Sequence, residues 1–452
     1  MQKRLFCTLM AILMIGMSIK LKAQPGVLDP ADPDQVFTAT TQPAAPTWAR
    51  MSKWGHSNRL TWNGKRPFDY GFKSYYYKGM AFRIKFPKSY QHNVADGKKY
   101  PIMVFLHGLG ERGDIYDNEY QMLHGGQTHA EKVDNGTFDG FLFYSQSSNG
   151  YHAAYFPMIS EMIDSLVKYV KVDKDRTILS GLSSGGQGTW EFLANYSKFF
   201  AAALPISAAR PEYKSSVPNF ITLPIWTTNG GLDNNPDPTA VTDLLGYING
   251  LGGNTRQTFY PTQGHGVWNT FWAEPDYFPT LSTYHKANPL VYFGRTEFCA
   301  GDPVSVKMGL QAGFSAYEWS KDGVTIAGAT SNIYTATTYG TYRGRFKRTA
   351  TSSWSDWSPI PVVVQQKAAT VTPPIQINGL RSNVVPAPDG STTVPLTVPN
   401  SSKYISFEWR RASDNVVVGN SAVYNAPAGQ YKVKVNEQFG CSSSFSSVYT
   451  VV

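Results

Sequence analysis

Between residues 79 and 285, short apolar runs alternate with stretches of helical periodicity, and few folds can accommodate that alternation. The runs at residues 102–106 and 141–144 are continuously apolar, as expected for strands buried on both faces of a sheet. Apolar residues recur at helical spacing at residues 159–170 and 241–248. The pattern predicts an α/β domain with a mostly parallel sheet flanked by helices. Further strands are expected at residues 177–180, 203–206, 224–227 and 258–260.

The pattern changes after residue 287, where helical periodicity gives way to short alternating stretches with Gly, Ser and Thr turns. Trp319 is followed by Tyr334, and Trp409 is followed by Tyr424 at the same spacing. Both copies resemble immunoglobulin-like or fibronectin-like modules, which carry a buried Trp and a late Tyr. The resemblance implies two all-β sandwiches. The predicted domains are an α/β domain with an N-terminal extension at residues 24–287 and sandwiches at residues 288–366 and 370–452.

The chain begins with the basic residues Lys3 and Arg4, followed by a short apolar run that ends before the small residue Ala23. This order predicts a secretory signal peptide at residues 1–23, since the apolar run is too short to remain as a membrane span. We expect secretion to the periplasm, the cell surface or the medium, with no integral membrane span after signal removal. The formal charge of +9 includes that basic segment, and no later run of Lys or Arg could follow a phosphate backbone, so no nucleic-acid partner is expected.

Two cysteines, Cys299 and Cys441, follow the expected signal peptide, one in each expected sandwich. A bridge within either sandwich is therefore excluded, and the two cysteines either pair with each other or stay as buried thiols. We favour buried thiols. The chain has no C-x-x-C, no H-E-x-x-H and no Cys/His cluster, so neither a metal nor another cofactor is expected. The oligomeric state is left open.

The candidate nucleophile is Ser183, because residues 181–185 read Gly-Leu-Ser-Ser-Gly and fit the pattern G-x-S-x-G. The pattern follows an expected strand and precedes a segment of small residues, which predicts a strand, a tight turn and a helix. The turn would lift the Ser183 hydroxyl above the sheet edge. Ser184 is the neighbouring hydroxyl, but it lies one place late in the pattern.

A serine hydroxyl needs a base to remove its proton. In hydrolases with the G-x-S-x-G motif, an acid and a histidine follow the serine in chain order. His265 lies in a loop directly after the last expected strand, whereas we expect His285 to be a surface residue. Asp233 follows the strand at residues 224–227 and is the preferred acid. Asp237 is the rival, with the alternative role of a helix N-cap before Pro238.

Cleavage of an acyl bond also requires hydrogen-bond donors for the oxyanion of the tetrahedral intermediate. We expect these donors to be the backbone N–H groups of Ser184 and Leu109. Leu109 lies in the turn His107-Gly108-Leu109-Gly110 that follows the strand at residues 102–106. His107 is expected to hold this turn in place.

Residues 99–113, with Asp117-Asn118-Glu119 after them, closely resemble bacterial esterases of the feruloyl esterase and polyhydroxybutyrate-depolymerase-like type. Residues 172–176 and 200–203, on either side of the predicted turn, match the same group, as does Gly264-His265 followed by Trp268. The resemblance implies an α/β-hydrolase fold and a secreted serine carboxylic-ester hydrolase that acts through an acyl-enzyme. Its expected partner is an ester substrate, with feruloyl or acetyl groups on a polysaccharide as the implied class.

The chain departs from the group at Gln146, which follows Tyr144-Ser145 where Pro-Gln is usual, and at Asn229, where His is usual. Both positions lie near the expected substrate pocket. Gln146 and Trp268 are therefore hypothesised to line that pocket. The alternative for Trp268 is packing beneath the His265 loop.

Two other functions remain open on the sequence. A prolyl-oligopeptidase-like serine peptidase would share the fold, although the long N-terminal propeller of such enzymes is absent. A non-catalytic surface protein that binds glycans would use the C-terminal modules instead. There, Arg343, Arg345 and Lys347 recur at period two before Trp354 and Trp357, which predicts cations stacked on Trp rings in a structural role, with sugar binding as the alternative.

Overall fold

The computed structural model describes residues 35–37, 54–56, 70–77, 80–92, 94–113, 120–151, 153–377, 393–438 and 440–452. The signal peptide expected at residues 1–23 lies outside these residues and stays a prediction. The chain forms two compact units, each described here by itself. The first comprises the described parts of Met1–Gly294 with Lys307–Tyr334 and Tyr342–Val362, and the second Arg295–Val306, Thr335–Thr341 and Val363–Val452.

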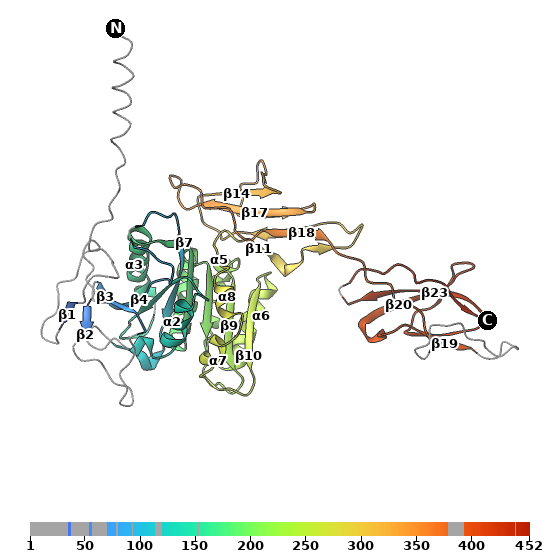
Figure 1. The fold of residues 1–452 in the computed structure, drawn as a ribbon, viewed down its shortest axis with the longest axis horizontal. Helices are drawn as coiled ribbons and strands as arrows, with labels where there is room; N and C mark the ends of the chain where they lie inside the picture. Colours follow the sequence, from blue (N-terminus) through green and yellow to red (C-terminus); the bar gives the residue numbers. More distant parts are fainter. Residues whose placement is uncertain are drawn as a thin grey trace, which may run out of the picture. The chain divides into compact units, whose positions relative to one another are not determined.

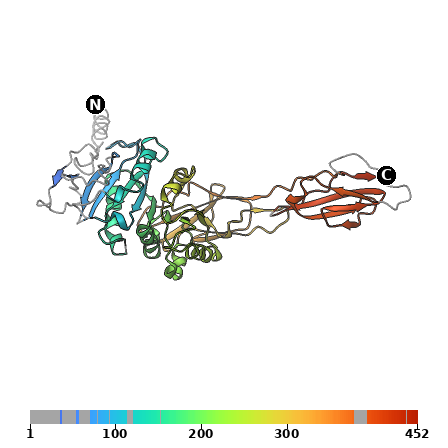
Figure 2. The same ribbon diagram turned by 90° about the horizontal axis from the view of Figure 1, so that it is seen from below.

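An eight-stranded sheet forms the centre of the first unit, with strand order β10-β9-β8-β7-β5-β6-β4-β3 (Figures 1 and 2). The pairs from β6 to β10 are parallel, and only β3 and β4 run antiparallel to their neighbours. The predicted mostly parallel sheet flanked by helices is confirmed. Its strands are β3 (Lys73–Tyr77), β4 (Met80–Lys85), β5 (Tyr100–Leu106), β6 (Phe141–Ser145), β7 (Val172–Leu182), β8 (Ala202–Ile206), β9 (Ile225–Gly230) and β10 (Thr255–Tyr260).

An apolar core covers each face of the sheet. Successive residues of a strand point to opposite faces and so belong to different cores. In β5, Ile102, Val104 and Leu106 belong to one apolar core, while Met103 and Phe105 belong to the other. The first core includes helices α3 (Phe156–Tyr169), α4 (Ser184–Tyr196) and α6 (Pro238–Gly250). The second includes α2 (Gly126–Asp134), α7 (Trp268–Trp272) and α8 (Tyr277–Leu281).

The segments after residue 287 are short strands in small sheets, and the sandwich architecture itself stays a prediction. The repeated motif also repeats in geometry: the indole N–H of Trp319 donates to Ser331 O at 2.8 Å, and that of Trp409 donates to Ser421 O at 2.8 Å. In each copy the Trp ring contacts the repeated Tyr, with centroids 5.7 Å apart for Trp319–Tyr334 and 5.9 Å for Trp409–Tyr424. The two copies therefore share local geometry as well as the sequence motif.

The remaining elements are short. The strands after the α/β domain are β11 (Leu290–Val291), β12 (Glu297–Phe298), β13 (Val306–Gly309), β14 (Ala316–Lys321), β15 (Val324–Thr325), β16 (Ile333–Ala336), β17 (Gly340–Lys347), β18 (Val362–Gln366), β19 (Val394–Thr397), β20 (Tyr404–Arg411), β21 (Val417–Gly419), β22 (Val423–Ala426), β23 (Gly429–Glu437) and β24 (Tyr449–Val451). Near the N-terminus, β1 (Gln35–Phe37) pairs with β2 (Trp54–His56). Short helical turns are η2 (Leu109–Glu111), η3 (Tyr120–Met122), η4 (Ala153–Tyr155), η5 (Ser197–Phe199), η6 (Pro211–Ser216), α5 (Val217–Phe220), η7 (Tyr292–Gly294) and η8 (Ser401–Lys403). Among the described residues, no helix combines the length and apolarity needed to cross a membrane.

The predicted stacking of cations on Trp rings is present in β17. The Arg345 guanidinium lies 4.3 Å from the Trp357 ring centroid and 5.0 Å from that of Trp354, and Lys347 Nζ lies 5.2 Å from Trp354. Arg343 does not join them, because its guanidinium donates to the Pro359 carbonyl at 3.0 Å. Arg345 is also paired with a carboxylate, so the contacts hold the end of the strand in place.

The expectation of two buried thiols is wrong. Cys299 and Cys441 form a disulfide within the second unit, across a sequence separation of 142 residues. The sequence offered both outcomes, and only the tertiary arrangement brings the two Cα atoms to 5.6 Å.

Candidate active site

Ser183 lies at a sharp turn between β7 and α4. Strand β7 ends at Leu182 and helix α4 begins at Ser184, and between them Ser183 has φ 53° and ψ −118°. A non-glycine residue rarely adopts such a conformation, and it persists only where the surroundings fix it. The structure therefore has the strand, tight turn and helix predicted around Ser183.

The glycines of the motif allow this turn because backbone atoms approach them closely. A Cβ on Gly185 would lie 2.6 Å from His107 O and closer still to Leu106 O. A Cβ on Gly181 would lie 2.6 Å from the carbonyl carbon of Gly185. Since β5 pairs with β7 in the sheet, these contacts also place residues 106–108 beside the turn.

A chain of hydrogen bonds joins Ser183 to His265 and Asp233. Ser183 Oγ lies 2.8 Å from His265 Nε2, and His265 Nδ1 lies 2.8 Å from Asp233 Oδ2. The Asp233 side chain is almost fully buried, whereas the imidazole is 38% exposed. With the proton on Nδ1 donated to the carboxylate, Nε2 is free to accept the Ser183 proton.

The two candidate acids have different positions. Asp233 Oδ1 accepts the Asn235 N–H at 2.9 Å, which orients its other oxygen toward His265. Asp237 caps α6, where its carboxylate accepts the Thr239 N–H at 2.8 Å and the Thr239 hydroxyl at 2.6 Å. Hydrogen bonds from the Thr239 side chain and backbone lower the pKa of Asp237. The structure thus places Asp233, and not its rival, against the imidazole.

A small pocket opens at the Ser183 hydroxyl, with a volume of about 330 Å³. Ser207 contributes to it and also holds the histidine loop, since its hydroxyl donates to His265 O at 2.7 Å. Ser207 has φ 48°, which the sequence gives no means of foreseeing. The lining residues are Ser183, Gln187, Ser207, Leu232, Asp233, Asn234, Asn235 and His265.

The two backbone N–H groups expected to act on an oxyanion, those of Ser184 and Leu109, lie on segments next to Ser183. Ser184 is the first residue of α4, where N–H groups have no partner within the helix. Leu109 begins the η2 turn directly after Gly108. A Cβ added to Gly108 would lie 2.7 Å from a methyl group of Leu182, the residue before Ser183. The expected donors therefore come from segments that meet at Ser183.

His107 is buried and holds the η2 turn in the way that the sequence predicts. Its Nε2 accepts the Ser147 N–H at 3.0 Å, so the proton lies on Nδ1, which donates to Gly108 O at 2.8 Å. Burial lowers the pKa of His107 to about 4, and the ring is neutral at ordinary pH. A neutral imidazole with both ring nitrogens in hydrogen bonds holds the turn in place and does not act as a second base.

Glu111 lies in this turn, and the sequence pattern predicts no role for it. Its carboxylate accepts the N–H of Gly108, and its side chain is buried. Its backbone oxygen accepts the amide of Gln146 at 2.8 Å. Burial raises the pKa of Glu111 to about 7. His124 Nε2 lies 3.4 Å from the same carboxyl, but burial lowers the pKa of His124, so this contact is not an ion pair at neutral pH.

Glu111→Gln should remove part of the pH dependence of stability. The folded protein keeps the Glu111 proton up to about pH 7, whereas the unfolded chain releases it near 4.5. Stability from this group is therefore greatest at low pH and falls by about 3 kcal/mol as pH rises from 4.5 to 7. His107 acts with the opposite sign, so the quantity to measure is the difference in unfolding free energy between wild type and variant. Denaturant titrations at pH 5 and pH 8 should show that this difference changes by about 3 kcal/mol. For the control Glu131→Gln, at an exposed glutamate, the difference should be the same at both pH values.

The hypothesis that Gln146 and Trp268 line the pocket at Ser183 is not supported by their positions. Neither is among the residues lining it, because the Gln146 amide is turned toward Glu111 and is buried. Trp268 packs edge-on against the His265 ring, with centroids 5.8 Å apart, as in the alternative. The expectation that His285 lies on the surface is wrong, since it is 7% exposed and its Nδ1 accepts the Ala287 N–H.

Comparison with known proteins gives solved structures only, since no family model and no curated protein matches the chain. A thermostable esterase is 26% identical over 46% of this chain and 60% of its own length, with a TM-score of 0.38. A ferulic acid esterase is 18% identical over 45% of this chain and 92% of its own, with a TM-score of 0.36. An acylaminoacyl peptidase is 15% identical over 43% and 38%, with a TM-score of 0.34. At TM-scores this low, function has to be inferred from the geometry of the site.

Proposed function

We propose that this protein is a serine carboxylic-ester hydrolase with Ser183 as nucleophile, His265 as base and Asp233 as its orienting acid. The observation that carries the proposal is the pair of 2.8 Å hydrogen bonds joining the three side chains at a strained turn. The chain order Ser, Asp, His and the strand–turn–helix position of the serine fit the α/β-hydrolase class.

In the proposed reaction, Ser183 Oγ attacks the ester carbonyl carbon as His265 Nε2 takes its proton. The N–H groups of Leu109 and Ser184 stabilise the oxyanion. Collapse of the tetrahedral intermediate breaks the bond to the alcohol oxygen, which receives the proton from His265. Water then attacks the acyl-Ser183 carbonyl as His265 takes its proton. Collapse of this second intermediate releases the acid, and His265 returns the proton to Ser183 Oγ.

The proposed substrates are acyl groups on polysaccharide, of the feruloyl or acetyl type. Support comes from the resemblance of residues 99–113 to esterases of that kind and from the pocket itself. Its lining is largely polar, with the Gln187, Asn234 and Asn235 amides close to the nucleophile. Such groups can hydrogen-bond to hydroxyls around the cleaved ester.

Secretion is part of the proposal. The Cys299–Cys441 disulfide supports it, because disulfides persist mainly in oxidising compartments outside the cytosol. The signal peptide expected at residues 1–23 is consistent with that route.

The substrate class is tested by assaying the wild type and Ser183→Ala on an aryl acetate, a feruloyl sugar, an acetylated sugar and a chromogenic peptide. We expect turnover of the esters by the wild type and none by the variant, with the sugar esters having the highest kcat/KM. Turnover of the peptide alone would identify a peptidase instead. An inert wild type that binds polysaccharide would identify an adhesion protein.

A further inference from the structure

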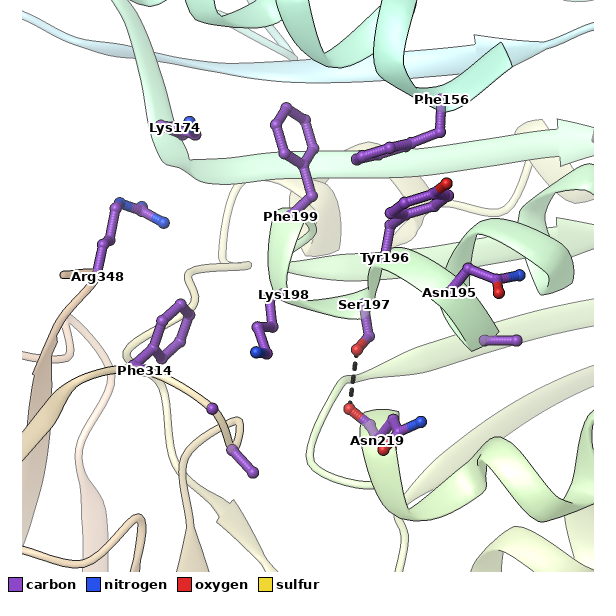
Figure 3. A pocket seen from close by; sticks show the side chains of 13 residues that line it. Phe156, Lys174, Asn195, Tyr196, Ser197, Lys198, Phe199, Asn219, Phe314 and Arg348 are labelled. Atoms are coloured by element: carbon purple, nitrogen blue, oxygen red, sulfur yellow. Dashed lines mark hydrogen bonds between the residues drawn. The ribbon is translucent and has the colours of Figure 1, made fainter. Parts of the chain in front are cut away.

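A second pocket, larger than the one at Ser183 with a volume of about 720 Å³, lies in the first unit (Figure 3). Residues 194–199, at the end of α4 and in η5, line one side, and residues 312–314 with Arg348 line the other. Lys174, at the start of β7, also lines it, whereas Ser183 follows the end of that strand. Nine residues of extended chain span about 30 Å, so this pocket is separate from the candidate active site.

The lining of this pocket contains three cations and no carboxylate. Lys174 is paired with Asp164, and Arg348 with Asp175. The Lys198 ammonium group has no hydrogen bond or ion pair to any residue that the structure describes, and the residue is exposed. The pocket therefore offers one unpaired positive charge, together with two that are partly neutralised by carboxylates.

The position of Lys198 depends on a glycine opposite it. A Cβ on Gly313 would collide with Lys198 Cε and Nζ, so the absence of a side chain at Gly313 lets the lysine extend there. The ammonium group of the buried Lys286 donates to Lys198 O at 2.7 Å. Burial holds the pKa of Lys286 well below its ordinary value; the charges of Arg348 and Lys174 lower it further, and those of Asp175 and Asp173 raise it.

Aromatic rings also line the pocket, with Phe156 and Tyr196 on the side away from Lys174 and Arg348 (Figure 3). Tyr196 is stacked on Phe156 with ring centroids 3.8 Å apart, and Phe314 is stacked on Phe346 at 4.0 Å. Stacking fixes these rings in place, so a ligand meets rigid apolar surfaces. The side chains of Asn195 and Asn219 also line the pocket and can hydrogen-bond to a ligand, although the Asn195 amide nitrogen also donates to Glu191 O at 2.8 Å.

We propose that this pocket binds a carboxylated segment of polysaccharide, such as a run of uronic acid residues. A pyranose ring offers an apolar C–H face to an aromatic ring, hydroxyls to amides and, in a uronate, a carboxylate to Lys198. The volume falls within the range of about 300–1,000 Å³ that is usual for small-ligand sites. The choice of a sugar rests on the proposed function, and the site would keep the enzyme on a polymer whose esters it cleaves elsewhere.

The test uses tetragalacturonate and its fully methyl-esterified form, which differ in charge but share a backbone. Both are titrated calorimetrically into the full-length Ser183→Ala protein, which cannot turn over the esters. We expect tetragalacturonate to bind at least about tenfold more tightly than the ester. Lys198→Glu should weaken binding of tetragalacturonate at least about tenfold, while Lys198→Arg stays within about twofold of the parent.

Lys403→Glu is the matched control, because it makes the same charge change at an exposed lysine outside the pocket. It should bind as the parent does. Equal affinity for the two sugars, no measurable binding, or full binding by Lys198→Glu would overturn the proposal. Turnover of an aryl acetate by Lys198→Glu with Ser183 intact should equal that of the wild type. Ester turnover without binding would refute this site alone, and binding without turnover would refute the esterase alone.

Discussion

Asp233→Asn is expected to lower kcat on an aryl acetate by about 10⁴-fold without unfolding the protein. The Asp233 carboxylate accepts the His265 Nδ1 proton at 2.8 Å, and this bond selects the tautomer whose Nε2 can accept the Ser183 proton. An amide in its place presents N–H groups to the ring and removes the negative charge that stabilises the imidazolium. Steady-state kinetics above and below KM, with circular dichroism to check folding, measure the effect.

Asp237→Asn is the matched control, four residues further along the same loop. Asp237 contacts Thr239 and not the imidazole, so its substitution should leave kcat within about twofold of wild type. Asparagine is itself a good N-cap, and stability should change by less than about 1 kcal/mol. A larger loss of activity in Asp237→Asn than in Asp233→Asn would reverse the assignment.

Adding a single methyl group by Gly185→Ala should strongly lower both the stability and the activity of the α/β domain. Its Cβ would lie 2.6 Å from His107 O and nearer to Leu106 O, and both are backbone atoms that cannot rotate away. We expect a loss of at least about 3 kcal/mol in unfolding free energy, measured by denaturant titration. Any shift that relieves the contact also moves Ser183, so the folded variant should lose about 100-fold in kcat/KM.

Gly246→Ala provides the comparison. Gly246 lies inside α6, and a Cβ there would meet no atom within 4 Å. Alanine should therefore stabilise the helix by about 0.5–1 kcal/mol and leave turnover unchanged. Equal changes in unfolding free energy and turnover for Gly185→Ala and Gly246→Ala would show that close packing around Gly185 does not fix the turn at Ser183.

The sequence predicts the main sheet well because each strand has its own local signal. The apolar run at residues 102–106 becomes part of β5 at the sheet centre, and the stripe at residues 159–170 becomes the buried face of α3. The positions of Ser183, Asp233 and His265 follow strand ends, so parallel topology alone brings them to one edge. Local pattern and topology therefore suffice to place these three residues.

What the sequence does not predict depends on contacts between distant segments. The left-handed backbone of Ser207 and the burial of Glu111 have no local signature. Gln146 follows a strand toward the site, yet hydrogen bonding to Glu111 turns its amide away. The cysteines pair across 142 residues, a closure that spacing alone leaves undecided.

The most direct test of the proposed site is to identify the nucleophilic serine by covalent labelling. The wild type is mixed with a fluorophosphonate, digested, and mapped by mass spectrometry. We expect a single phosphonyl group on Ser183, no labelling of Ser183→Ala, and at least about 100-fold slower labelling in His265→Ala, because Ser183 Oγ lies 2.8 Å from His265 Nε2. Labelling of Ser184 or Ser207 in the wild type, or labelling at the same rate without His265, would contradict the assignment.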